Sequence, residues 1–447
     1  MPEVTQASAA GVAGPLAGEA DRPGMVRAGA FALGLKGAYV AAQFGVGVLL
    51  ARALGPVGLG TYAFVMAVVQ VLVIVGQWGI PALLMRRVAI DMQAAKLADV
   101  KSNVSSGLVL VTLTALTAGA AFFVGASLIE PKLIWASVPV IVLVITMALG
   151  STIGGALRGF GYIVPSLLAE ETLRLWLLVI VLAGMLALGS PLTARTALLI
   201  HAVCGVLALV AGAALLLRLT PGPLRTAKRS PRLRATAVQG FPFLLLLSAQ
   251  TLSYQTDTIM LGLLSPGAPV GLYRAAFQVA EAVGILLFAI STVIGPHLAR
   301  VGHNPAQLRS ILVRAHRVGV GLVAPGLIVV LILGNRLLGW LFGVDFVAAT
   351  FAMQILVAGK LFYASTCFVG LALSMMGRAW AAATISAVVI FANVALDLIL
   401  IPRFGIDGAA IADATSNFLV AAGGALYLRR LFDGSGVTAF AIIRQRS

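Results

Sequence analysis

Residues 133–157 read LIWASVPVIVLVITMALGSTIGGAL, an apolar run without a single charged side chain. A helix needs about 20 apolar residues to cross the hydrocarbon core of a bilayer, so this run is long enough to span it. The whole chain has the same character: 60% of its residues are hydrophobic, 10% are charged, and the mean hydropathy is +1.04. A surface exposed to water would need more charge. The sequence therefore indicates an integral membrane protein and excludes a soluble globular one.

Apolar runs of this kind recur along the chain. The other charge-free runs are 102–129, 175–194, 196–217, 235–256, 282–299, 318–335 and 379–396. Splitting the remaining segments at Gly, Pro and charge clusters gives roughly twelve spans. Their centres are Val40, Val71, Leu113, Val144, Leu178, Leu207, Thr251, Ile285, Leu327, Gly359, Val389 and Val420. The predicted fold is all-α, with about twelve transmembrane helices.

Lysine and arginine are distributed unevenly between the two sides of the predicted membrane. With the amino terminus in the cytoplasm, 22 of the 31 basic residues lie on the cytoplasmic side or in the terminal tails. The basic residues on the outer side are Arg52, Lys132, Arg195, Arg336 and Arg403. The positive-inside rule then places both termini in the cytoplasm. The same rule accounts for much of the net charge of +16, so no nucleic acid partner is expected.

A basic stretch at 218–234 divides the predicted spans into two sets of six. It contains three prolines and a glycine, as a linker does. The predicted domains are a disordered cytoplasmic tail at 1–26, a first lobe at 27–218, a basic cytoplasmic linker at 219–238, a second lobe at 239–431 and a cytoplasmic tail at 432–447. An internal repeat supports the division, because Pro56-Val-Gly-Leu59 precedes Tyr62 and Pro269-Val-Gly-Leu272 precedes Tyr273.

Several short motifs resemble a known family. They are LARALGPVGLGTY at 50–62, QWGIPAL at 77–83, QTDTIMLG at 255–262, VGLY at 270–273, LFGVDF at 341–346 and LIPRFGIDGAAIA at 400–412. Their order and spacing resemble the polysaccharide-type lipid-linked oligosaccharide flippases of the multidrug/oligosaccharidyl-lipid/polysaccharide exporter superfamily. The resemblance implies two lobes facing each other across a central cavity. It also implies transport of a polyprenyl-pyrophosphate-linked oligosaccharide from the cytoplasmic to the outer leaflet, in the synthesis of a surface polysaccharide such as O-antigen of lipopolysaccharide or an exopolysaccharide.

Polar side chains recur at helical spacing inside the apolar runs of the second lobe. These stripes are Gln250, Tyr254 and Asp257; Arg274, Gln278 and Glu281; Asn393 and Asp397; and Asp413 and Asn417. Charged groups in a spanning helix are costly and therefore line a cavity or pair with one another. For Arg274 and Asp257 both interpretations are open: a structural ion pair between neighbouring helices, or groups that face a transport cavity.

Arginine and lysine side chains in the spans are the candidates for substrate binding. They form charge-assisted hydrogen bonds to the oxygens of a pyrophosphate. The candidates are Lys36, Arg174, Arg274 and Lys360, together with Gln278. Two structural alternatives stand beside them: Lys36 and Lys360 could reach the membrane surface by snorkelling, and Arg174 could pair locally with Glu170 or Glu171.

Carboxylates in the spans are candidates for ion coupling, because a buried acid can exchange a proton or Na⁺ during transport. These candidates are Asp257, Glu281 and Asp397. No cofactor is expected, and the Walker loop of nucleotide-driven pumps is absent from the sequence. The histidines lack ligand-like spacing, so no metal site is expected, and His297, His303 and His316 are predicted to be solvated beside a basic loop.

The predicted function is that of a transporter and not of an enzyme, located in the bacterial cytoplasmic (inner) membrane. Its predicted partners are the lipid-linked oligosaccharide, the bilayer, and the glycosyltransferases and polymerase of the same pathway. Two alternatives remain open. An ion-coupled multidrug exporter of the same superfamily would bind cationic drugs in a cavity lined by carboxylates. A membrane polysaccharide polymerase or ligase would need a larger polar loop than this sequence contains.

Overall fold

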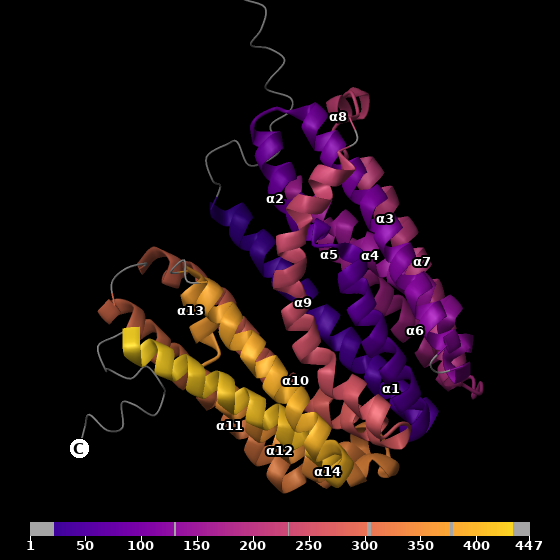
Figure 1. The fold of residues 1–447 in the computed structure, drawn as a ribbon, viewed down its shortest axis with the longest axis vertical. Coiled ribbons are helices and arrows are strands. Elements are labelled where there is room, and N and C mark those ends of the chain that lie inside the picture. The colour runs from indigo at the N-terminus through magenta and orange to yellow at the C-terminus, as the bar shows by residue number, and fades with distance from the viewer. Residues whose placement is uncertain (1–21, 129–130, 231, 302–304, 376–378, 432–447) are drawn as a thin grey trace, which may run out of the picture. The chain divides into compact units, whose positions relative to one another are not determined.

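The computed structural model describes residues 22–128, 131–230, 232–301, 305–375 and 379–431, so most of the two predicted tails lies outside the described residues. Every regular element in these ranges is helical. The α-helices are α1 (Arg22–Gln77), α2 (Ile80–Gln93), α3 (Leu97–Leu128), α4 (Ser137–Gly159), α5 (Ile163–Leu167), α6 (Leu173–Ala187), α7 (Ala194–Leu219), α8 (Gly222–Thr226), α9 (Leu233–Leu264), α10 (Ala268–Val301), α11 (Pro305–Leu341), α12 (Thr350–Ala364), α13 (Phe368–Met375) and α14 (Ala379–Leu431) (Figure 1). Short 3-10 helices lie at Pro131–Ala136 and Val344–Ala349, and a π-helix, η2, lies at Leu168–Thr172 between α5 and α6.

The two longest helices each contain two membrane crossings. The apolar helical segments Gly34–Gln93 and Thr384–Tyr427 have 60 and 44 residues, whereas about 20 helical residues cross the hydrocarbon core. A glycine with positive φ interrupts each of α1 and α14: φ is 64° at Gly55 and 57° at Gly405. Side chains with a Cβ rarely adopt this conformation, so glycine allows the chain to leave one helix and enter the next.

The described residues contain seven helical segments that are long and apolar enough to cross a membrane. The number is eight if the bent pair Leu233–Ala249 and Thr251–Leu264 counts as one span. Two of these segments hold two crossings each, and every predicted span centre lies within one of the α-helices. The prediction of an all-α integral membrane protein with about twelve spanning helices is confirmed.

The described chain divides into two compact units. Met1–Leu49 and Val65–Thr251 form the first, and Leu50–Phe64 and Leu252–Ser447 form the second. Helix α9 therefore begins in the first unit and ends in the second. The predicted linker at 219–238 contains α8 and the first residues of α9. The predicted lobes at 27–218 and 239–431 stay a prediction.

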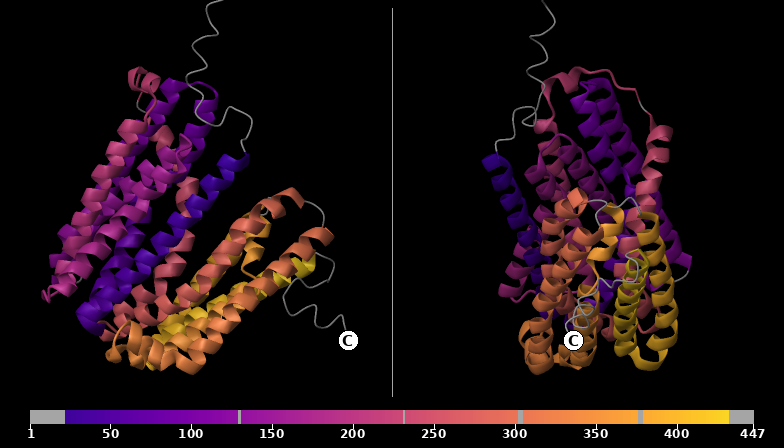
Figure 2. Two further views of the ribbon diagram at one scale, coloured as in Figure 1. Left: turned by 180° about the vertical axis from the view of Figure 1, so that it is seen from behind. Right: turned by 90° about the vertical axis from the view of Figure 1, so that its left-hand side faces the viewer.

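Each unit is built around one central helix. In the first unit α4 packs against α2, α3 and α7, and in the second unit α12 packs against α10, α11 and α14. Figure 2 shows the helices of the second unit, orange to yellow, running side by side. These positions are equivalent, because α4 and α12 carry the fourth predicted span of each half.

Glycines let α4 pack closely on both of its sides. A Cβ at Gly150 would lie 3.2 Å from Ala169 O in η2, and one at Gly154 would lie 3.2 Å from Ser166 O. On the other side, a Cβ at Gly155 would collide with the backbone of Pro81 in α2, and one at Gly159 would lie 2.6 Å from Val88 Cβ. Small residues at this spacing allow two membrane helices to approach closely.

We expect Gly155→Ala to lower the unfolding free energy by about 1–3 kcal/mol, because the neighbouring atoms belong to backbone and cannot rotate away. Thermal unfolding of the purified protein in detergent measures the effect. Gly184→Ala in α6 is the matched control, since a Cβ there has no other atom within 4 Å. Equal unfolding temperatures for the two variants would contradict the close contact between α2 and α4.

The two copies of the sequence repeat meet inside the second unit. A Cβ built on Gly60 would lie 3.0 Å from the backbone N of Gly271, and a Cβ built on Gly271 would lie 2.9 Å from the backbone N of Gly60. This reciprocal contact aligns Gly60-Thr-Tyr62 with Gly271-Leu-Tyr273. The repeated tetrapeptide instead matches Gly58 with Gly271, so the structural register of the repeat differs from it by two residues.

Arg52 holds the same segment of α1 to the second unit. Its Nε donates to Leu341 O at 2.9 Å, and its guanidinium also donates to Trp340 O. These carbonyls lie in the last turn of α11, where the helix itself supplies no donor. A cation there also interacts favourably with the helix dipole.

Candidate functional site

The stripes of polar residues predicted in the second unit come together in its interior. Asp257 of α9 accepts a hydrogen bond from the Tyr273 hydroxyl of α10 at 2.5 Å. Its carboxylate also lies within hydrogen-bonding reach of Asn393 and Asp397 of α14. Asp257, Tyr273, Asn393 and Asp397 are all buried. We call these four residues the aspartate layer.

The aspartate layer holds two neighbouring carboxyl groups with oxygens that no described donor reaches. Asp397 is completely buried, and among the described side chains no donor reaches either of its carboxylate oxygens or Oδ1 of Asp257. Two adjacent buried carboxylates cannot both remain ionised without a counter-charge. A shared proton or a small cation such as Na⁺ would supply it. The described residues contain no group of three His, Cys, Asp or Glu side chains placed to hold a metal ion.

A second cluster of polar residues in this unit contains Lys360. Lys360 of α12 forms an ion pair with Glu281 of α10, and the Tyr254 hydroxyl of α9 hydrogen-bonds to the same carboxylate. Asn417 donates to Asp413 at 2.9 Å along α14. The side chain of Lys360 is 13% exposed. An acid within the same unit therefore neutralises this lysine.

Arg274 is placed differently from Lys360. Its guanidinium carbon lies 5.5 Å from the ring centroid of Phe277 and 6.0 Å from that of Tyr254. Its Nη1 is buried without a hydrogen-bond partner, and the ion pairs among described residues do not include Arg274. Aromatic faces stabilise a cation without neutralising it. The structure thus gives no ion pair between Arg274 and Asp257, which was one of the two interpretations of these residues.

The other candidates on α10 lie on the same face of the helix as Arg274, as the spacing predicts. Gln278 lies one turn after Arg274 and is half-buried, and Glu281 lies one turn further on. The side chain of Gln250, which begins the stripe on α9, lies outside the described residues. The second unit therefore gathers Arg274, Gln278, Lys360 and all three ion-coupling candidates.

Two of the substrate-binding candidates belong to the first unit. Arg174 is buried in α6 and contacts the ring of His201 in α7. Glu170 pairs instead with Arg158 of α4 at 3.1 Å. The alternative in which Arg174 pairs locally with Glu170 or Glu171 is not found among the described residues, and both glutamates lie within η2. A π-helix has a wider turn than an α-helix, so the residues after it face a different direction.

Lys36 is exposed on α1, and its ammonium lies 4.4 Å from the ring centroid of Tyr39. This position is compatible with snorkelling and does not test substrate binding. The histidine prediction is wrong at His316, and the side chains of His297 and His303 lie outside the described residues. His316 is completely buried on α11 and stacks on Phe368 at 5.4 Å, so it is not solvated. Its spacing from Leu312 at i−4 was the signal for a buried face.

Comparison with known proteins gives the family. Residues 26–301, more than half of the chain, match the family model described as polysaccharide biosynthesis protein. The chain belongs to this family. The matched region extends to the end of α10 and so includes Asp257, Arg274 and Glu281.

Two relatives of the protein come from Haloferax volcanii. The probable low-salt glycan biosynthesis flippase Agl15 is 26% identical over 162 residues, which cover 36% of this chain and 34% of the relative. The probable flippase AglR is 30% identical over 171 residues, which cover 36% of this chain and 35% of the relative. The alignments thus span about a third of the length of these relatives.

Solved transporters share the fold of the polysaccharide biosynthesis protein. The inward-facing conformation of a multidrug resistance MATE family transporter of the MOP superfamily has a TM-score of 0.72 at 14% identity, covering 88% of this chain and 94% of that one. The lipid II flippase MurJ, in an inward closed conformation, has a TM-score of 0.66 at 12% identity, covering 90% of this chain and 87% of that one. These identities establish the fold alone. The resemblance noted in the sequence is confirmed at the level of the family and of the fold.

Proposed function

We propose that this polysaccharide biosynthesis protein is a flippase, and not an enzyme, that moves a polyprenyl-pyrophosphate-linked oligosaccharide from the cytoplasmic to the outer leaflet by alternating access. The family, the names of the two relatives and the shared fold support transport. In this proposal the protein works in the bacterial cytoplasmic membrane during surface polysaccharide synthesis. Glycosyltransferases make its substrate and a polymerase uses its product.

The observation that carries the proposal is Arg274. A guanidinium buried in a membrane protein normally pairs with an acid, because an uncompensated charge there is costly. Arg274 rests on two aromatic rings, and its buried Nη1 has no hydrogen-bond partner among the described residues. A pyrophosphate carries concentrated negative charge, and a planar guanidinium can bind its oxygens with two parallel hydrogen bonds. Arg274 is therefore the proposed binding residue for the pyrophosphate, with Gln278 beside it.

The aspartate layer is the proposed site of ion coupling. Its two carboxylates form no ion pair among the described residues, and a proton or Na⁺ entering from one side of the membrane would neutralise them. Tyr273 belongs to the aspartate layer and directly precedes Arg274 on α10. In this proposal, ion binding at the layer therefore changes the orientation of Arg274. An ion gradient would then drive the reorientation. No bound cofactor is part of the proposal.

Deletion of the gene in its native host tests the proposed function. The expected result is loss of surface polysaccharide together with accumulation of the lipid-linked oligosaccharide, both restored by the intact gene. A multidrug exporter would instead give increased sensitivity to cationic drugs with unchanged polysaccharide. A polymerase or ligase would leave single repeat units on the outer leaflet, which an added impermeant glycosidase could reach in spheroplasts.

The proposed topology has its own test. A cysteine at Lys228, after removal of Cys204 and Cys367, is expected to react with an impermeant thiol reagent only when the cytoplasmic side is open. Arg403→Cys in the same background is the control, because Arg403 is exposed at the Gly405 break and belongs to the proposed outer side. Labelling at 228 in intact cells would overturn the orientation.

A further inference from the structure

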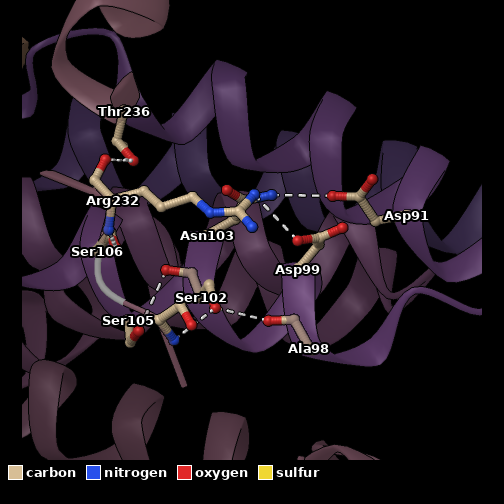
Figure 3. Close-up of polar contacts among 10 residues, drawn as sticks. Asp91, Ala98, Asp99, Ser102, Asn103, Ser105, Ser106, Arg232 and Thr236 are labelled. Carbon is tan, nitrogen blue, oxygen red and sulfur yellow. Dashed lines mark hydrogen bonds and ion pairs between the residues drawn. The ribbon is translucent and has the colours of Figure 1, made fainter. Parts of the chain in front are cut away.

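The backbone of the basic linker is fixed to the first unit by a set of polar contacts (Figure 3). The N–H of Ser230 donates to Ser102 Oγ at 3.0 Å, and the N–H of Arg232 donates to Ser106 Oγ at 2.9 Å. The guanidinium of Arg232 also forms an ion pair with Asp99 at 3.0 Å. Ser102 and Ser106 lie one helical turn apart on α3, so two successive turns hold alternate residues of the linker. We call this arrangement the serine seam.

Further contacts extend the attachment toward α7. Lys101 donates to Arg225 O at 2.5 Å, and Arg225 donates to Leu217 O at 2.7 Å at the end of α7. Leu224 of α8 is buried. The sequence predicts a linker, but the described part of it is held at several points rather than being a free tether.

These contacts leave other cations exposed at the same end of the first unit. The acids nearest in sequence are already engaged: Asp99 pairs with Arg232, and Asp91 accepts from Asn103 at 2.9 Å. Six of the exposed cations at this end take part in no ion pair among the described residues: Arg86, Arg87, Lys96, Lys228, Arg229 and Arg234. We call these six residues the basic surface.

Exposed apolar side chains adjoin the basic surface. Met85 and Ile90 stand on either side of the two arginines on α2, and Val238 and Phe241 follow Arg234 on α9; all four are more than 40% exposed. Both helices belong to the apolar spans. Cations beside exposed apolar residues at the end of a spanning helix are typical of the headgroup region of a membrane.

We propose that the basic surface binds the phosphate groups of several anionic phospholipids in the cytoplasmic leaflet, in a position fixed by the serine seam. The proposal rests on the proposed orientation of the flippase. Several phospholipids fit better than one diphosphate, because Arg86 lies about 10 Å along the helix axis from the end of α2, Lys96 lies beyond that end, and the linker carries Lys228, Arg229 and Arg234. A fixed backbone also loses less conformational entropy on binding than a free loop does. The bound lipids would hold the first unit at the membrane surface.

Binding of phosphatidylglycerol to the purified full-length protein tests the proposal, with phosphatidylcholine as the uncharged reference. The triple variant Lys228→Ser, Arg229→Ser, Arg234→Ser is expected to bind phosphatidylglycerol at least tenfold more weakly, since each cation at an anionic surface contributes about a fivefold factor. The control is Arg336→Ser with Arg403→Ser, which removes two exposed cations of the second unit. It is expected to bind as the unaltered protein does. Equal weakening in both variants, or none in the triple variant, would overturn the proposal.

A second variant tests the serine seam without removing any charge. Ser102→Ala with Ser106→Ala deletes both acceptors of the linker N–H groups, and it is expected to weaken phosphatidylglycerol binding several-fold while the unfolding temperature stays within a few degrees. Binding equal to that of the unaltered protein would show that the seam does not organise the surface.

A competition experiment identifies the source of the phosphate. A polyprenyl diphosphate added at a tenth of the phosphatidylglycerol concentration is expected to displace little of it. Full displacement would assign the surface to the transported lipid and overturn the phospholipid proposal. The direct binding assay contains no sugar lipid, so failure of the flippase proposal would leave its result unchanged, and the two proposals fail separately.

Discussion

Arg274→Ala is expected to abolish surface polysaccharide while the amount of protein in the membrane stays normal. The guanidinium forms no ion pair with a described acid, so its removal leaves no buried carboxylate without a partner. Arg274→Lys is expected to retain part of the activity, because lysine supplies the charge without the planar fork. Complementation of the deletion strain, scored for polysaccharide and membrane protein together, measures both variants.

The alternative for Arg274 is a structural role toward Asp257. If the two residues only neutralised each other, each single change would cost several kcal/mol and the double change Arg274→Leu with Asp257→Leu would restore folding and export. The expected result is that the double variant remains inactive. Arg336→Ala, which removes an exposed arginine of α11, is the matched control and is expected to export normally. Recovery of export in the double variant would refute the assignment of Arg274 to the substrate.

Asp397→Asn is expected to uncouple transport and at the same time to stabilise the protein. Asparagine has nearly the same shape as aspartate and carries no charge, so the substitution removes a completely buried carboxylate that has no donor among the described side chains. Replacing an uncompensated buried charge by a neutral group is favourable for folding. The expected result is an unchanged or higher unfolding temperature together with loss of the dependence of transport on an ion gradient.

Ligand-linked stabilisation shows whether Asp397 binds an ion. An ion that binds only the folded state raises the unfolding temperature, so Na⁺ or a lower pH is expected to stabilise the unaltered protein more than Asp397→Asn. Asp345→Asn is the control, since Asp345 is exposed. An identical response of the unaltered protein and Asp397→Asn to both conditions would contradict the coupling site.

The sequence predicts the spans well because a membrane imposes one strong rule. A helix that crosses the hydrocarbon must be apolar for about 20 residues, and such runs are visible without any knowledge of tertiary contacts. The same rule explains why polar stripes such as Asp257 with Tyr254, and Arg274 with Glu281, are recognisable. A charged side chain inside an apolar run is costly in a membrane, so it indicates a cavity or a pairing partner.

Partners of the charged residues are harder to predict. Lys360 pairs with Glu281 across two helices whose rotations about their axes are set by packing, and a single sequence does not contain those rotations. The pairing partner of Arg174 is hard to predict for a local reason. The i+3 and i+4 rule assumes an α-helix, and the π-helix at Leu168–Thr172 interrupts that periodicity. His316 was assigned to solvent from its basic neighbours, although its place beside Leu312 and Ala315 gives it an apolar environment.

The contact between Gly60 and Gly271 bears on how a protein of this length arose. A Cβ on either glycine would approach the backbone nitrogen of the other, so two copies of one motif pack through the same surface. That is the geometry of an isologous dimer interface, in which a patch is complementary to itself. A half-length ancestor with six spans would have both termini on the same side of the membrane, so two copies would have the same orientation. Two such chains could associate through this motif before their genes were joined. After fusion, neither glycine could be replaced by a residue with a side chain without displacing the helix that carries the other glycine. The two halves must therefore evolve together at this point.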